Sequence, residues 1–407
     1  MTTPSELGEV LSRYAAAHGG ELAWALEYSS KTRFQVLVRV FAPDRVRLPR
    51  PGNWQENSLG TPSSELTFRT DAEYFYPASM VKVPVAMAAM RSIKELASEA
   101  GAEITPDTPF RLFDRAGKYV SPSGSRVEGE LASDAPGAAV WQPGHDCFSG
   151  FGDDVERSLI ISDNPASNRL HELAGARRLA ALAQQGIIIN HRLSDFRPAE
   201  LQREFLGVEF LRRETSGPND QVLLAVPPHT GELPRSAADQ TVGLRVGRAY
   251  IDPLTGERVD GPFDFALKNR CTLRDLLTSI EHASLIAAAP NASDWSAIIA
   301  QSMAASSHLG RRLRFDQRLF PAEHYKWIGS EIGAHLATYF NKVGRAYGFS
   351  TEAAVFVPNE SSLPIVSLAA TMLTCDGGVL NADEYEYDRA DAVFTQLGRC
   401  VAAHLWA

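Results

Sequence analysis

Apolar residues recur at helical spacing near the start of the chain and in denser runs soon afterwards. A stripe running from Leu7 to Tyr14 predicts an amphipathic helix over residues 4–18, because positions three and four apart share one helix face. The runs ELAWALEY (21–28) and FQVLVRVFA (34–42) predict two strands. The chain therefore opens with a helix followed by part of a sheet.

The pattern becomes helical again after Pro77, where Ala, Val and Met dominate as far as Ala97. Pro84 must lie near the start of this helix, because proline is tolerated only where its missing N–H needs no partner. Ser79 is therefore expected at or near the helix N-terminus. Further helical patterns cover residues 152–185, 196–213, 271–288 and 294–308.

Strand-like runs return at the C-terminal end, over residues 334–344, 353–358 and 364–372, and a closing amphipathic helix covers 386–405. Strands, then helices, then strands indicate an α+β fold rather than βαβ winding. We expect one antiparallel sheet built from both ends of the chain, flanked by the N- and C-terminal helices, and a separate all-helical lobe.

The expected domain boundaries follow from this order. Residues 1–78 and 325–407 would form the discontinuous sheet domain, and residues 79–324 the helical domain. Two irregular stretches rich in Gly, Pro and polar residues, at about 120–148 and 214–265, would be inserted loops.

Composition narrows the classes of function. The 407 residues carry a formal net charge of −9, which argues against a nucleic-acid surface but not against an anionic substrate in a basic pocket. Four scattered cysteines contain no C-x-x-C pair, so zinc and thioredoxin-like sites are poor readings, while thiols and disulfides both stay open. No apolar run is long enough to span a membrane.

Three short motifs carry the candidate chemistry: Ser79-Met80-Val81-Lys82, Ser162-Asp163-Asn164 and Lys342-Val343-Gly344. A serine hydroxyl is a weak nucleophile that needs an adjacent base. Residues three apart on a helix share a face, so Lys82 can reach Ser79. Each motif alone is weak, and a helix-capping role is the plain alternative for the second. Their order and local context give the set its force.

Together the motifs resemble the S-x-x-K, S-D-N and K-T-G set of class A β-lactamases and penicillin-binding proteins. The resemblance implies an acyl-enzyme on Ser79 with Lys82 as base, Ser162 relaying a proton to the leaving group, and Lys342 supplying positive charge. It implies no metal or other cofactor. It also implies that Asn164 binds a substrate carbonyl.

The remaining predicted substrate contacts follow the third motif. The resemblance implies that the backbone N–H of Arg345 is an oxyanion donor beside that of Ser79. Tyr347 lies close enough in sequence to line the same site. The predicted substrate-binding residues are therefore Asn164, Val343, Gly344, Arg345 and Tyr347.

Two departures from the family pattern change the expected activity. Val343 replaces a hydroxyl-bearing residue that the family uses for a substrate carboxylate. In the loop where class A enzymes carry a glutamate before a proline to activate water, Arg197 precedes Pro198, and Glu200 is displaced in sequence. Glu200 is the candidate for the deacylation base, and the alternative is an exposed carboxylate with no catalytic role, as most glutamates are. Slow deacylation is therefore expected.

The sequence thus predicts a serine hydrolase that cleaves an amide or ester, with a β-lactam, a peptidoglycan-like peptide or a small ester as the open substrate classes. A non-catalytic binding or sensor domain on the same fold is the alternative. The family works outside the cytoplasm, which favours a periplasmic or secreted protein. The segment MTTPSELGEVLSRY lacks the pattern of a signal peptide, so a cytoplasmic location stays open.

Overall fold

The structure is a computed structural model that describes residues 6–42, 60–119, 148–195, 201–212, 221–232, 242–285, 294–305, 326–382 and 384–406. It is a mixed α+β fold with antiparallel sheets. The chain divides into two compact units. Unit 1 comprises Met1–Val81, Ala237–Ala289 and Glu323–Ala407, and unit 2 comprises Lys82–Ser236 and Pro290–Ala322.

Unit 1 is built around a five-stranded sheet whose strands come from both ends of the chain. Its order is β13-β14-β15-β1-β2, and every neighbouring pair is antiparallel. The strands are β1 (Gln35–Phe41), β2 (Ser64–Phe68), β13 (Leu336–Ala346), β14 (Phe349–Pro358) and β15 (Ile365–Leu373). This arrangement confirms the predicted sheet of both chain ends.

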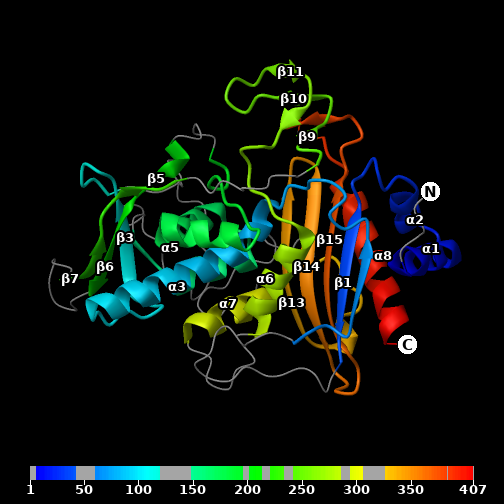
Figure 1. The fold of residues 1–407 in the computed structure, drawn as a ribbon, viewed down its shortest axis with the longest axis horizontal. Helices are drawn as coiled ribbons and strands as arrows, with labels where there is room; N and C mark the ends of the chain where they lie inside the picture. The colour runs from blue at the N-terminus through cyan, green and yellow to red at the C-terminus, as the bar shows by residue number, and fades with distance from the viewer. Residues whose placement is uncertain are drawn as a thin grey trace, which may run out of the picture. The chain divides into compact units, whose positions relative to one another are not determined.

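Helices cover both faces of this sheet. Helices α1 (Glu6–His18), α2 (Glu21–Glu27) and α8 (Tyr387–Leu405) lie on one face, and α6 (Leu273–Leu285) lies on the other (Figure 1). A continuous apolar core fills the space under α1, α2 and α8, with Leu11, Leu22 and Phe394 among its fully buried side chains. The predicted flanking by terminal helices is therefore observed.

One predicted strand is a helix instead. The run 21–28 forms α2, because its apolar residues Leu22 and Ala25 are three apart and both fully buried, which is a helical spacing. Neighbouring apolar residues in this short run made its helical spacing look like that of a strand.

Helix α6 belongs to unit 1 and not, as the predicted domain boundaries have it, with the residues that follow Ser79. Its apolar face explains this placement: Leu273, Leu276, Leu277 and Ile280 are all fully buried, and the helix contacts strands β1, β13, β14 and β15.

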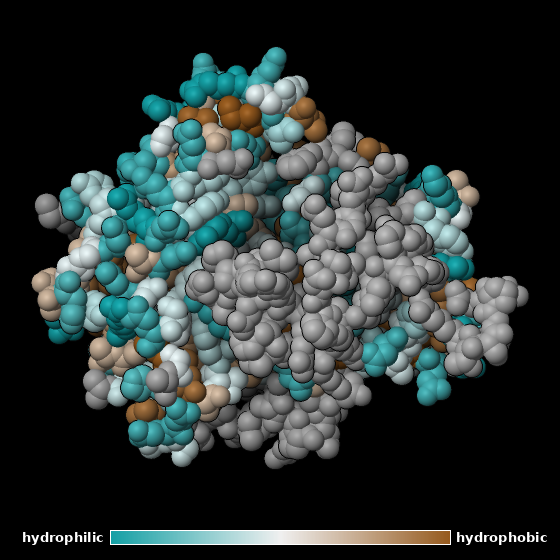
Figure 2. Space-filling view, turned by 180° about the vertical axis from the view of Figure 1, so that it is seen from behind, coloured by the Kyte–Doolittle hydropathy of each residue, from teal (hydrophilic) through white to brown (hydrophobic). Residues whose placement is uncertain are grey.

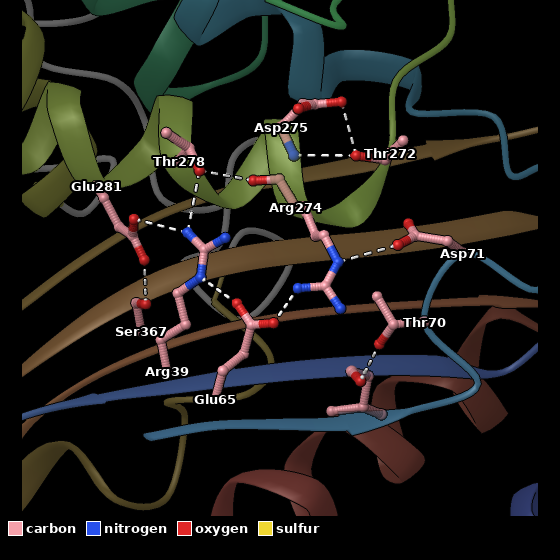
Figure 3. A network of polar contacts seen from close by, with 11 residues as sticks. Arg39, Glu65, Thr70, Asp71, Thr272, Arg274, Asp275, Thr278, Glu281 and Ser367 are labelled. Atoms are coloured by element: carbon pink, nitrogen blue, oxygen red, sulfur yellow. Dashed lines mark hydrogen bonds and ion pairs between the residues drawn. The ribbon is translucent and has the colours of Figure 1, made fainter. Parts of the chain in front are cut away.

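An ionic network fastens α6 to the sheet (Figure 3). Arg39 on β1 donates to Glu65 on β2 at 2.9 Å and to Glu281 on α6 at 2.9 Å. Glu281 also accepts from the Ser367 hydroxyl on β15. Arg274 on α6 binds Glu65 as well. Burial raises the pKa of Glu281, and the charge of Arg39 opposes that shift.

The segment predicted as an irregular insertion at 214–265 contains several short strands. They are β7 (Gln221–Val226), β8 (His229–Thr230), β9 (Arg245–Val246), β10 (Ala249–Ile251), β11 (Arg258–Asp260) and β12 (Phe263–Asp264). Strand β10 pairs with β11 and also, in parallel, with β16 (Val379–Leu380). Hydrophobic residues gather over β10 and β11 at the top of Figure 2, and Leu254 between these strands is 73% exposed.

Unit 2 combines helices with a sheet of its own. Its helices are α3 (Lys82–Ala100), α4 (Phe151–Ile160), α5 (Asn164–Gln184) and α7 (Asp294–Ala304). Its four-stranded sheet has the order β4-β3-β6-β7, with β3 (Pro109–Phe113), β4 (Phe148–Gly150) and β6 (Gly207–Arg212). A two-stranded sheet pairs β5 (Glu204–Phe205) with β8.

The lobe is therefore not all-helical. The predicted helix at 196–213 was wrong over its described part, which is a 3-10 turn (Leu201–Arg203) followed by β5 and β6. Burial along β6 does not alternate, which explains the error: the adjacent residues Phe210 and Leu211 are both buried and imitate a helical stripe. The other predicted insertion, 120–148, lies almost wholly outside the described residues.

No helix in the described part of the chain is long and apolar enough to cross a membrane. Cys271, Cys375 and Cys400 are free thiols, and Cys147 lies outside the described residues.

Replacing Arg39 by Met should lower the free energy of unfolding by about 3 kcal/mol, because Glu281 would stay buried without its cation. Arg274→Met is the matched control: its side chain is 42% exposed, so its loss should cost less than about 1 kcal/mol. Urea unfolding followed by circular dichroism measures both. Equal losses would show that the network does not depend on the buried Arg39–Glu281 pair.

Candidate active site

Ser79 lies on a 3-10 turn, Ala78–Val81, that runs directly into helix α3 at Lys82. The turn is closed by the backbone N–H of Met80, which donates to the carbonyl of Pro77 at 3.0 Å. Pro84 is the third residue of α3, where proline is tolerated. Ser79 therefore occupies the start of the helical run, as the sequence predicts.

Strand β13 approaches this turn at Gly344. A Cβ added to Gly344 would lie 2.4 Å from the Pro77 carbonyl oxygen and 3.0 Å from the backbone nitrogen of Met80. Only glycine permits two backbones to pass so closely. The glycine of the third motif thus brings β13 against the Ser79 turn within unit 1.

The side chains of Val343 and Arg345 point to the face of the sheet opposite the one on which Gly344 meets the Ser79 turn. Val343 is 5% exposed and belongs to the apolar core, and it lies across the strands from Glu352. The guanidinium of Arg345 lies over the rings of Trp327 and Tyr387 at 4.5 and 4.6 Å and pairs with Asp391 of α8. Val343 and Arg345 could therefore make their predicted substrate contacts only through their backbone N–H and C=O groups.

Because β13 is the edge strand of the sheet, alternate backbone N–H and C=O groups along it point away from β14. The predicted oxyanion donor, the N–H of Arg345, is on this strand. Its role as a donor stays a prediction.

Lys342 is nearly completely buried, at 2% exposure. Its amine donates to the carbonyl of Val343 at 3.1 Å. Burial, together with the positive charge of Lys326, lowers the pKa of Lys342 to about 7, although the negative charge of Glu352 opposes the shift. The positive charge predicted for Lys342 is therefore full in mild acid and largely lost in mild base.

A buried polar cluster of unit 1 is centred on Glu352, which lies across the strands from Val343. This carboxylate accepts from the backbone N–H groups of Trp327 and Ile328, at 3.2 and 2.7 Å, and from Nδ2 of Asn341 at 2.6 Å. Lys326 donates to Oδ1 of the same asparagine at 2.6 Å. These bonds replace the water that a buried carboxylate loses.

Tyr347 and Gly348 form the two-residue turn between β13 and β14, and both have positive φ, as type I′ hairpins require. The Tyr347 ring stacks on Phe263 at 5.4 Å and meets the edge of Tyr76 at 5.1 Å. Tyr76 precedes Ser79 by three residues. Tyr347 therefore belongs to an aromatic cluster of unit 1 beside the Ser79 turn.

In unit 2, the first and second motifs meet at Lys82. Its amine is fully buried, and it donates to the backbone carbonyl of Ser162, to the Ser162 hydroxyl at 3.1 Å, and to Oδ1 of Asn164 at 2.7 Å. Asp163 caps helix α5 by accepting from the N–H of Ala166 at 2.8 Å, so one residue of the second motif has the helix-capping role that was its plain alternative.

Ser194 is a polar residue of this group that the sequence did not single out. Its hydroxyl accepts from Nδ2 of Asn164 at 2.7 Å. The preceding residue, Leu193, is fixed by two bonds with the side chain of Asn168, both 2.9 Å long. A serine in a turn carries no distinguishing signal, so only the fold reveals it. Glu200 and Arg197 lie outside the described residues.

Four non-glycine residues at these positions have positive φ: Ala78 (46°), Ser162 (60°), Ser194 (55°) and Tyr347 (55°). Such backbone costs energy and persists where surrounding contacts hold it, and it gathers at functional sites. Two of these residues are in each unit, beside the candidate side chains.

The structure thus assembles the predicted residues into two groups. In unit 1, Gly344 of the third motif lies against the turn that carries Ser79, and in unit 2, Lys82, Ser162 and Asn164 come together. The peptide bond from Val81 to Lys82 joins them. No cluster of three or more metal-binding side chains lies among the described residues.

No protein-family model and no curated protein matches this chain. Solved structures match along nearly its whole length. The β-lactamase from Sphaerobacter thermophilus is 12% identical, covers 98% of this chain and 96% of its own, and has a TM-score of 0.45. The β-lactamase from Desulfarculus baarsii is 16% identical, with 97% and 98% covered and a TM-score of 0.45.

A β-lactamase from Burkholderia vietnamiensis is 12% identical, covers 98% of this chain and 96% of its own, and has a TM-score of 0.46. At such identities and TM-scores, this likeness assigns a role to no residue of the present chain.

Gly344→Ala should lower the free energy of unfolding by about 2–3 kcal/mol, because the new methyl group would overlap backbone atoms of Pro77 and Met80. Gly333→Ala, where nothing lies within 4 Å of the added Cβ, is the control and should change little. Thermal and urea unfolding compare them. A neutral Gly344→Ala would mean that β13 does not pack against the Ser79 turn.

Lys342→Met should stabilise the protein most in mild acid. Between the folded pKa of about 7 and the ordinary value of 10.5, the folded protein binds fewer protons than the unfolded chain, so wild-type stability rises with pH. The advantage of the Met variant should shrink by about 1.4 kcal/mol per pH unit across this range. Urea unfolding from pH 6 to pH 10 measures the gap. If the difference in free energy of unfolding between the variant and the wild type does not change with pH, Lys342 does not have a lowered pKa.

Proposed function

We propose that this protein is a serine hydrolase that cleaves an amide or ester through an acyl-enzyme on Ser79, with Lys82 as the base. The observation that carries the proposal is the fully buried amine of Lys82, which Ser162 and Asn164 hold through three oxygen atoms. An amine so placed, three residues after a serine at the start of a helix, suits proton transfer better than a surface or packing role.

Acylation would proceed as follows. The hydroxyl proton of Ser79 passes to a neutral Lys82 amine while Oγ attacks the substrate carbonyl. The oxyanion that forms accepts from the N–H groups of Ser79 and Arg345. The proton then leaves Lys82 through the Ser162 hydroxyl, 3.1 Å away, and reaches the departing nitrogen or oxygen as its bond to carbon breaks.

Deacylation is the slow step of this proposal. It needs a base to take a proton from water. In the part of the chain that the structure describes, the amide of Asn164 bonds to the amine of Lys82 and to the hydroxyl of Ser194. These two partners include no carboxylate that could take a proton from water. A hydroxyl is a poor base at neutral pH. A long-lived acyl-enzyme would suit a transpeptidase-like or weakly hydrolytic enzyme better than an efficient β-lactamase.

Incubation with a fluorescent penicillin and with p-nitrophenyl acetate should add one acyl group to Ser79, seen as a mass increase of the intact protein. Ser79→Ala should gain no mass. Lys82→Met should slow acylation by about 10²–10⁴, the usual contribution of a general base.

Lys94→Met is the control for a lysine of the same helix α3, and its acylation rate should match the wild type. Equal labelling of Ser79→Ala would place the reaction elsewhere. No labelling with either reagent, together with ligand binding that survives Ser79→Ala, would support the alternative of a non-catalytic binding or sensor domain.

A further inference from the structure

A cluster of charged side chains lies in unit 2, where helices α3 and α5 pack against each other (Figure 1). Arg177 and Arg178 of α5 both donate to the same carboxylate oxygen of Glu95 on α3. Arg91 precedes Glu95 by four residues, so both side chains lie on one face of α3. Three arginines and one glutamate leave a net charge of +2, to which Lys94 on the same helix adds.

Within the ranges that the structure describes, no carboxylate pairs with the guanidinium of Arg91. The side chain of Arg91 is half-buried. Burial and the positive charge of Arg178 lower the pKa of Arg91, and no carboxylate opposes the shift. A partly buried cation beside a like charge is unfavourable unless an anion joins it. The surroundings of Arg91 therefore favour an anionic ligand.

Arg178 also has an unfilled donor. Its Nη2 binds Glu95, but its Nε is buried and has no hydrogen-bond partner among the described residues. A buried donor of a charged group costs free energy until it meets an acceptor. Arg91 and Arg178 are near enough to repel each other, and each has donors that one anion could use.

The start of a helical segment adds to the positive potential. Gly175 has a φ of 67° and a ψ of 166°, which are not helical, so α5 breaks there and its second segment begins at Ala176. The first turn of a helix carries partial positive charge from N–H groups without intrahelical partners. Basic residues are disfavoured in this turn, yet Arg177 and Arg178 occupy it. Backbone and side chains therefore both favour a bound anion.

We propose that Arg91 and Arg178 together bind a phosphate group, either free phosphate or a phosphate monoester. A phosphate dianion balances a net charge of +2, and its several oxygens can accept from two guanidinium groups at once. A carboxylate would balance half of that charge. Both arginines are half-buried, so a ligand can reach them while salt screens them less than it screens exposed charges. Binding at this site does not depend on the acylation of Ser79.

Titration calorimetry with inorganic phosphate at about pH 8, where phosphate is a dianion, tests the site. The wild type should bind phosphate with a Kd of about 1 mM or tighter. Arg91→Met should weaken binding at least about tenfold, because hydrogen bonds to a charged group are lost while the apolar stem is kept. Arg212→Met removes the same charge from an exposed position on β6 of the same unit, and its Kd should stay within about twofold of the wild-type value.

Arg91→Glu supplies the missing anion from the protein itself. It brings the net charge of the four side chains from +2 to zero, so phosphate binding should be lost. The melting temperature measured without phosphate should rise above that of the wild type, because a repulsion is replaced by an attraction. Phosphate should raise the melting temperature of the wild type and leave that of Arg91→Glu unchanged.

Two further ligands identify the anion. If glycerol 3-phosphate binds more tightly than inorganic phosphate, the ligand is a larger phosphorylated molecule, and if the two bind equally, free phosphate suffices; both results support the site. Acetate that binds as tightly as phosphate would overturn the assignment of a dianion. The site itself is overturned if about 10 mM phosphate shows no binding to the wild type, or if Arg91→Met and Arg212→Met lose affinity equally.

Discussion

A buried amine must exchange its water shell for protein acceptors, and Lys82 does so with three oxygen atoms from two residues, Ser162 and Asn164. This exchange constrains much of unit 2. The turn that carries Ser162 must keep a positive φ, helix α5 must begin at Asn164, and Asp163 must cap it. The hydroxyl of Ser194 then accepts a hydrogen bond from the Asn164 amide.

Unit 1 also buries charged groups, Lys342 and Glu352, but their surroundings differ from those of Lys82. Glu352 gathers backbone and side-chain donors, whereas Lys342 has its pKa lowered toward neutrality by burial. Its amine can therefore lose its proton at a modest cost near pH 7. One buried lysine is held by polar partners and the other is easily neutralised, although both belong to the same predicted set of residues.

The sequence predicted the elements with a clear period or a clear chemical signature. The apolar strands β1, β13, β14 and β15, the amphipathic helices α1 and α8, and the turn at Ser79 were all recognisable from local pattern. The failures have a common cause, which is that short apolar runs fit both periods. Residues 21–28 and the strand β6 were each assigned the wrong one.

The candidate site was predictable only as a set of residue types. The meeting of Lys82 with Ser162 and Asn164 follows from the motifs, and the structure contains it. The direction of the Val343 and Arg345 side chains depends on strand register, which a single sequence does not fix. Ser194 was invisible, because its importance comes from a contact thirty residues distant along the chain.

The pairing of β1 with β15, in which Gln35 faces Thr371, has a consequence for biosynthesis. At 5–20 residues per second, the ribosome would take roughly 20–70 s to make the chain between these partners. For that time β1 would present an apolar edge without its neighbour, a state open to wrong association. The nascent chain would thus depend on chaperones or on transient shielding by its own N-terminal helices until translation is nearly finished.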